Sequence, residues 1–210
     1  MKRWLVILIM LSVSAGVSAQ SLTEQEIVSL FEQSAADMQS LECRFVQTKK
    51  MKMLNDKMVS EGRMCYEKPE KLKWEYITPF VYSFTVNGNK ALVRNSEGVN
   101  VVDMDKNRNF RKFTGAIMNL LTGDAIADTK AFSLSAEEND GKCIVTLVPK
   151  RNDIKQMWKH IVLHFDRTAN SIVKVEINEA SGDIMVIEFM DIRRNMPVGN
   201  DVFNIQTDLR

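Results

Sequence analysis

Most of this chain alternates between apolar and polar residues, a period of two that β-strands show when one face of their sheet is buried. In the segment 71–76, Leu72, Trp74 and Tyr76 alternate with charged residues. The same separation recurs at 63–67 and 173–178. The sequence therefore predicts a β-sheet with one apolar face and one hydrated face.

Turn-forming sequences such as Asn87-Gly88-Asn89 and Asn139-Asp140-Gly141 divide this pattern into short runs, as in antiparallel hairpins. We expect about eleven strands. Their expected ranges are 42–53, 58–67, 71–77, 81–87, 90–95, 99–104, 131–137, 142–149, 159–166, 171–178 and 183–190.

Two segments have the periodicity of helices. From 23 to about 41 apolar residues recur at helical spacing, and Thr23 with Glu26 forms a capping box. The segment 115–121 is short and strongly apolar. An open apolar sheet face would aggregate, so these helices are the available cover. We expect a mainly antiparallel α+β fold, a curved sheet with helices over its concave side.

The first residues are typical of a cleaved signal peptide. Lys2 and Arg3 precede an apolar run at 5–11, and small residues end at Ala19. The run is shorter than the roughly 20 residues that a membrane-spanning helix needs, which disfavours a membrane anchor. The residue directly after the expected cut is Gln20 rather than a cysteine, so the new N-terminus has no acceptor for a lipid. We expect an exported chain whose residues 20–210 form a single domain.

The charge balance excludes one class of partner. The formal net charge of +1 becomes −1 when the two signal-peptide cations are removed, so nothing drives binding to nucleic acid. The basic residues at 49, 50 and 52 and at 108, 111 and 112 are interpreted as solvated strand ends. A docking surface is the alternative for these two clusters.

The cysteines do not suggest a disulfide framework. In a regular hairpin Cys43 shares a side with Phe45, whereas Cys65 shares the opposite side with Arg63. We expect no bond between Cys43 and Cys65.

Signatures of common enzymes are missing from the chain, which lacks G-x-S-x-G, H-E-x-x-H, Walker A and G-x-G-x-x-G motifs. His160 and His164 lie in an alternating segment, where four residues span about 13 Å, too far to share a metal ion. Carboxylates that could pair in a hydrolase are scattered, mainly on the hydrated face: Glu42, Glu61, Glu67, Glu75 and Glu188. We expect no catalytic residue, no metal and no cofactor.

One stretch resembles a known family. It contains Phe45-Val46-Gln47, then Gly62, then Lys68-Pro69 followed by Leu72, Trp74 and a further Pro79. This order is similar to the N-terminal half of the LolA lipoprotein carriers, and the downstream order of hairpins and a mid-chain helix also fits.

The resemblance implies an unclosed antiparallel half-barrel whose concave apolar face is lidded by helices. It also implies a non-enzymatic periplasmic carrier that binds lipoprotein acyl chains in a hydrophobic cavity and shuttles them from the inner to the outer membrane. The implied partners are an inner-membrane lipoprotein-releasing ABC transporter and an outer-membrane acceptor, and a monomer is expected.

The implied site combines inward-facing positions with the family motif. In the family an arginine before the first proline holds the lid by hydrogen bonds to helix backbone, and Lys68 occupies that position here. We expect Lys68 to contact the lid. The expected cavity residues are Phe45, Met64, Tyr66, Leu72, Trp74, Tyr76, Phe84, Ile117, Leu120, Leu121 and Val175.

Two alternatives stay open at this point. A LolA-like binding module could serve another apolar ligand or a protein partner. A periplasmic hydrolase would need two facing carboxylates in a deep pocket.

Overall fold

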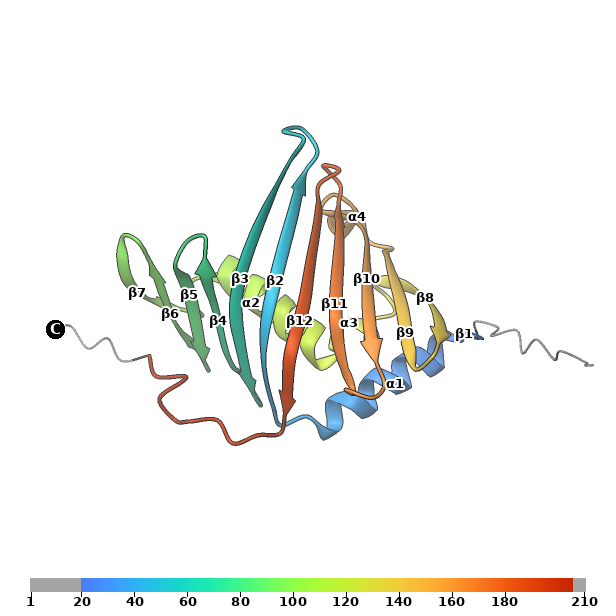
Figure 1. The fold of residues 1–210 in the computed structure, drawn as a ribbon, viewed down its shortest axis with the longest axis horizontal. Coiled ribbons are helices and arrows are strands. Elements are labelled where there is room, and N and C mark those ends of the chain that lie inside the picture. The colour runs from blue at the N-terminus through green and yellow to red at the C-terminus, as the bar shows by residue number, and fades with distance from the viewer. Residues whose placement is uncertain (1–19, 206–210) are drawn as a thin grey trace, which may run out of the picture.

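A computed structural model describes residues 20–205, so the expected signal peptide lies outside the described residues. The described chain forms a sheet of twelve antiparallel strands (Figure 1). The strands are β1 (Gln20–Leu22), β2 (Ser40–Met51), β3 (Asp56–Glu67), β4 (Lys71–Thr78), β5 (Tyr82–Asn87), β6 (Lys90–Asn95), β7 (Gly98–Asp103), β8 (Phe132–Asn139), β9 (Lys142–Pro149), β10 (Trp158–Asp166), β11 (Ser171–Glu179) and β12 (Ile184–Arg194).

Two meanders make up this sheet. Strands β2 to β7 follow one another across one half, and β8 to β12 across the other half. The halves join where β12 pairs with β2. Strands β1 and β7 are the two edges of the sheet and do not pair with each other. The expected unclosed, mainly antiparallel sheet is confirmed.

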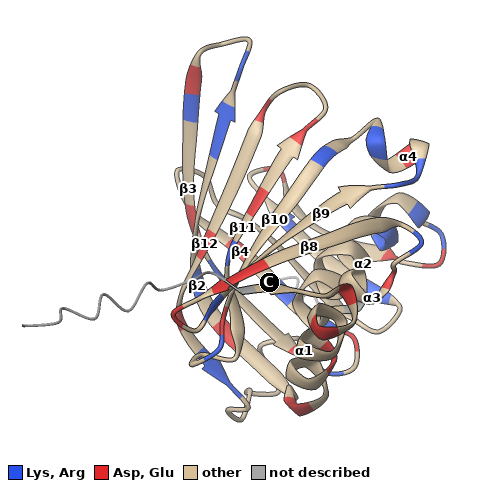
Figure 2. Cartoon of the chain, turned by 90° about the vertical axis from the view of Figure 1, so that its right-hand side faces the viewer, with Lys and Arg blue, Asp and Glu red and all other residues tan. Residues whose placement is uncertain are grey.

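The helices lie on one side of the curved sheet (Figure 2). They are α1 (Glu24–Asp37), α2 (Arg108–Thr122), α3 (Asp124–Ala127) and α4 (Asn152–Lys155). The connection from β7 to β8 contains α2 and α3, and it passes behind the strands in Figure 1. The apolar face is therefore covered by α1 on one part and by α2 on another.

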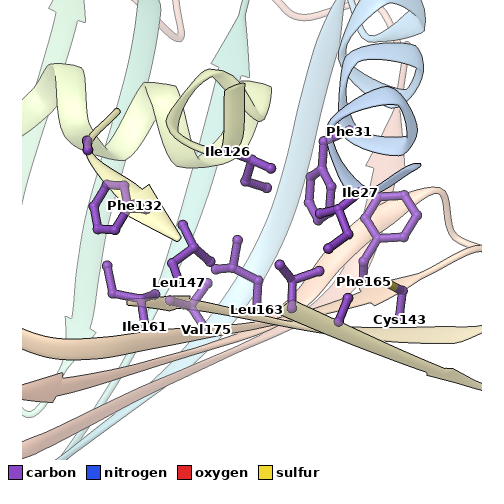
Figure 3. Close-up of a cluster of buried hydrophobic side chains, with 13 residues drawn as sticks. Ile27, Phe31, Ile126, Phe132, Cys143, Leu147, Ile161, Leu163, Phe165 and Val175 are labelled. Carbon is purple, nitrogen blue, oxygen red and sulfur yellow. The ribbon is translucent and has the colours of Figure 1, made fainter. Parts of the chain in front are cut away.

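Buried side chains form two clusters on this face. Figure 3 shows the first, in which Ile27 and Phe31 of α1 and Ile126 of α3 pack on strands β8 to β11. The second lies over β2 to β6, where Phe110, Ile117, Met118 and Leu121 of α2 pack only partly buried. Helix α1 is therefore packed more tightly on the sheet than α2.

The sequence-based strand bounds agree with the structure to within two residues, apart from the last strand, which extends to Arg194. A shift in register between Met190 and Arg193, with Asp191 at φ 53°, interrupts the alternation there. Strand β1 was not predicted because three residues are too few to show a period of two.

The helix predictions need two corrections. Helix α1 ends at Asp37 rather than near 41, because Met38 is extended and strand β2 begins at Ser40. Helix α2 begins at Arg108 rather than 115, and the Asn107 side chain caps it by accepting a hydrogen bond from the Phe110 N–H at 3.0 Å. The basic residues 108, 111 and 112 therefore lie on a helix, and their interpretation as strand ends was wrong.

The expected register of the first long hairpin is confirmed. Cys43 lies opposite Met64, and Cys65 lies opposite Glu42. Both cysteines are free thiols, as is Cys143. Burial raises the pKa of the Cys43 and Cys65 thiols to about 12 and that of Cys143 to about 11.

Strands β2, β3 and β4 pack closely around Gly62. Phe45 pairs with Gly62, and its ring lies where a side chain at 62 would be. A Cβ atom there would lie 2.1 Å from the Glu75 carbonyl oxygen and 2.3 Å from Phe45 Cζ. Glycine is therefore required at this position.

We predict that Gly62→Ala lowers the free energy of unfolding by about 3 kcal/mol, since the new methyl group displaces strand β4 and the Phe45 ring. Gly115→Ala is the matched control. It lies in α2 with nothing within 4 Å of the added Cβ, so it should be neutral or stabilising by up to about 1 kcal/mol. Urea unfolding measures both, and equal effects would contradict the close approach at Gly62.

We predict that the folded protein reacts with iodoacetamide at pH 8 far more slowly than protein unfolded in guanidinium. The thiolate is the reactive form, and an unfolded cysteine has a pKa near 8.5. Mass spectrometry of alkylated peptides measures the rates. Detection of a Cys43–Cys65 bond by non-reducing peptide mapping would contradict the register.

Candidate functional site

A cavity of about 300 Å³ lies between α2 and the apolar face of the sheet. This volume is at the lower end of the roughly 300–1,000 Å³ typical of small-molecule sites. Helix α2 contributes Phe113, Ala116, Ile117, Leu120 and Leu121. The opposite wall comes from both halves of the sheet, so the cavity spans the join between β12 and β2.

Most of the site residues expected from the sequence line this cavity. They are Trp74, Tyr76, Phe84, Ile117, Leu120, Leu121 and Val175. The expected Phe45, Met64, Tyr66 and Leu72 do not line it and belong to the buried cluster beside it. The Phe45 ring, for example, packs against that of Trp74, with 4.4 Å between the ring centroids.

Other lining residues were not singled out from the sequence. They come mainly from the last three strands: Trp158, Ile172, Ile177, Met185, Ile187 and Phe189. Alternation marked this region as one-sided, but the family motif covers only residues 45–79 and drew attention to the first half. The join of β12 with β2, which brings the second half to the cavity, is not visible in the sequence.

Polar groups are few in the cavity wall. Gln47 accepts a hydrogen bond from the Tyr76 hydroxyl at 2.9 Å. Burial raises the pKa of Tyr76, so this hydroxyl stays a neutral donor at physiological pH. Glu179 is the charged residue of the lining, and Lys49 Nζ lies 3.0 Å from it. The wall is therefore suited to an apolar ligand.

The C-terminal turn of α1 is held by donors from two distant segments. Lys68 Nζ donates to the carbonyl oxygens of Ala35 at 2.6 Å and Ala36 at 3.5 Å. Arg194 donates to the Ser34 carbonyl oxygen at 2.6 Å and to the Ser34 hydroxyl at 3.1 Å. Cations and donors at a helix C-terminus satisfy its free carbonyl groups and favour its dipole. The resemblance led to Lys68, whereas Arg194 had no signal in the sequence.

The two covering helices differ in how firmly they are held. In α1, Ile27 and Phe31 are 0% and 3% exposed. In α2, Thr114 is the buried residue, while the cavity-lining side chains are half-buried and Phe113 is 52% exposed. Because the apolar side chains of α2 are only partly buried, whereas α1 has Ile27 and Phe31 fully buried, α2 is the cover that we expect to move at lower cost.

The two histidines lie on strand β10, as expected, and His164 Nε2 lies 3.0 Å from Glu176 Oε1 on the neighbouring strand. Between residues 20 and 205 no group of three His, Cys, Asp or Glu side chains could hold a metal ion. Among the helices in that part of the chain, none has the length and apolar character needed to cross a bilayer.

Comparisons with known proteins agree with this architecture. The sequence model of the family described as "Outer membrane lipoprotein carrier protein LolA" matches residues 36–206. An outer-membrane lipoprotein carrier protein of Methylobacillus flagellatus is 26% identical over 148 residues, which cover 68% of this chain and 66% of that protein. The match thus spans just under two thirds of the relative's length.

Solved structures show the same fold at low sequence identity. An uncharacterized conserved protein from Thermus thermophilus has a TM-score of 0.52 and 8% identity, with 88% of this chain and 94% of that chain covered. The MucA/MucB complex of Pseudomonas aeruginosa has a TM-score of 0.50 and 9% identity, with 86% of this chain and 60% of the other covered.

The family match covers Lys68, the cavity wall on β4 and both meanders of the sheet. This chain therefore belongs to the family of the outer membrane lipoprotein carrier protein LolA.

Proposed function

We propose that this chain is a periplasmic carrier that encloses the acyl chains of lipoproteins and moves them from the inner to the outer membrane. The observation that carries the proposal is the apolar cavity under α2. Exposing an acyl chain to water costs about 0.8 kcal/mol per methylene, or about 12 kcal/mol for a chain of sixteen carbons. A shell that excludes water from the chain removes this cost.

Loading requires the cavity to enlarge, and α2 is the part that moves. Its inward residues are half-buried, whereas Ile27 and Phe31 of α1 are fully buried in the other cluster. A bound acyl chain replaces those contacts, so the open form is stabilised by its cargo. Lys68 and Arg194 keep the end of α1 in place while this happens.

Membership of the family supports the route that we propose for the cargo. In this proposal residues 1–19 are removed after Ala19, and the remaining single domain acts as a monomer. An inner-membrane lipoprotein-releasing ABC transporter loads it, and an outer-membrane acceptor receives the cargo. A protein partner or another apolar ligand is the competing function, and the experiment below separates it from the carrier.

We predict that the mature protein, purified from the periplasm without detergent, carries lipoprotein or acyl-chain adducts in native mass spectra. Ile117→Asp should lower binding of a fluorescent acyl probe at least tenfold, since it places a charge inside the cavity. Asn119→Asp adds the same charge to an exposed position two residues further along α2 and should leave binding unchanged. Equal effects, or apo protein that binds no probe, would refute the carrier.

We predict that Lys68→Met loosens the end of α1 by about 1–2 kcal/mol, because the carbonyl oxygens of Ala35 and Ala36 lose their charged donor. Hydrogen exchange at residues 34–37 should accelerate about tenfold, and release of the acyl probe should be faster. Lys68→Arg should behave like the unaltered protein. Lys73→Met is the control on the hydrated face, and exchange as fast as in Lys68→Met would argue against the contact.

A further inference from the structure

An unsatisfied donor lies in the wall of the cavity. The indole nitrogen Nε1 of Trp74 is buried and has no hydrogen-bond partner of normal geometry. Among the side chains of residues 20–205, Ser60 Oγ is the one other buried polar atom in this state. Trp74 is 4% exposed and lines the cavity. A buried N–H group without an acceptor destabilises the protein, so its retention in an apolar wall indicates that an acceptor arrives with the ligand.

The neighbouring polar groups increase the excess of donors. The Tyr76 hydroxyl donates its hydrogen bond to Gln47 Oε1. The amide nitrogen of Gln47, which lines the cavity, therefore keeps two N–H groups for other acceptors. Trp74 and Tyr76 have ring centroids 6.4 Å apart, and a weak hydrogen-bond interaction from the Trp74 side chain lowers the pKa of the Tyr76 hydroxyl, although burial outweighs this effect. No hydrogen bond of normal geometry forms between the two side chains, so the indole N–H still lacks a full acceptor. Trp74, Gln47 and Tyr76 thus form one polar spot, referred to below as the donor spot.

The charges around the cavity restrict the acceptor. The lining residues include no Lys, Arg or His, and their one charged group, Glu179, is paired with Lys49. A carboxylate entering the cavity would lose its hydration without gaining a counter-ion, and Glu179 would repel it. A neutral carbonyl oxygen meets the need of the donor spot without this cost.

We propose that the donor spot binds the ester or amide carbonyl at the root of an acyl chain, so that the cavity selects esterified or amide-linked chains over free fatty acids. This inference rests on the proposed function, because it presumes that the cavity takes acyl chains. It adds a polar determinant to a site that apolar burial alone would leave unselective. The Trp74 and Gln47 nitrogen atoms donate, and the carbonyl oxygen of the ligand accepts.

The test measures displacement of a fluorescent acyl probe from the mature protein at pH 7.4 by methyl palmitate, palmitate and hexadecane. The unaltered protein should bind the ester about tenfold more tightly than palmitate. Trp74→Phe retains an aromatic ring but removes the N–H group, so it should weaken ester binding about 2- to 10-fold more than it weakens hexadecane binding. Phe189→Leu, which alters the wall without altering a donor, should weaken both ligands alike.

A second measurement requires no variant. The Trp74 Nε1–H resonance of ¹⁵N-labelled protein should shift downfield on addition of methyl palmitate and stay in place with hexadecane. Binding of all three ligands without preference for the ester, or an unmoved resonance, would overturn the donor spot and leave the carrier intact. Failure to bind any of the three would overturn the carrier and the donor spot together.

Discussion

The apolar face of a sheet this wide cannot remain in water, and the rest of the structure depends on how that face is covered. Strands β8 to β11 receive α1 and α3 in close packing, whereas α2 packs over β2 to β6 and leaves a cavity that extends across the join of β12 with β2. The unequal cover separates the two tasks of the fold. One part of the face stabilises the protein, and the other remains available to a ligand.

Strand positions could be predicted from the sequence because alternation is a local property, and the predicted 71–77 or 90–95 differ little from β4 and β6. The ends of the helices could not be predicted in the same way. The sequence pattern puts the start of the mid-chain helix at Gly115, whereas α2 continues through this residue and begins after the Asn107 cap. The sequence also could not separate the residues that line the cavity from those buried in the core beside it. Phe45 and Trp74 both face inward, but Trp74 lines the cavity and Phe45 packs beneath it in the core, a difference set by tertiary packing.

The contact of Lys68 with the end of α1 shows how a resemblance and a structure complement each other. The family motif led to residue 68, where a lysine provides a donor without the planar fork of arginine. A guanidinium reaches the same turn of α1 from Arg194, beyond the irregularity of β12. Burial lowers the pKa of Arg194, yet arginine stays charged at any physiological pH. These two residues, far apart in the chain, reach the same turn of α1 from the ends of the strands on either side of β2, since β12 and β3 both pair with β2.

The connection that contains α2 leaves the sheet at its β7 edge and re-enters at β8, next to the opposite edge. A segment anchored at both ends cannot swing outward like a door on one hinge. The space beneath it grows when the two margins of the sheet move apart or when the helix slides along its length. In the proposed carrier, loading and release would therefore be coupled to the curvature of the sheet, and a contact that flattened the sheet would act on the cavity from outside.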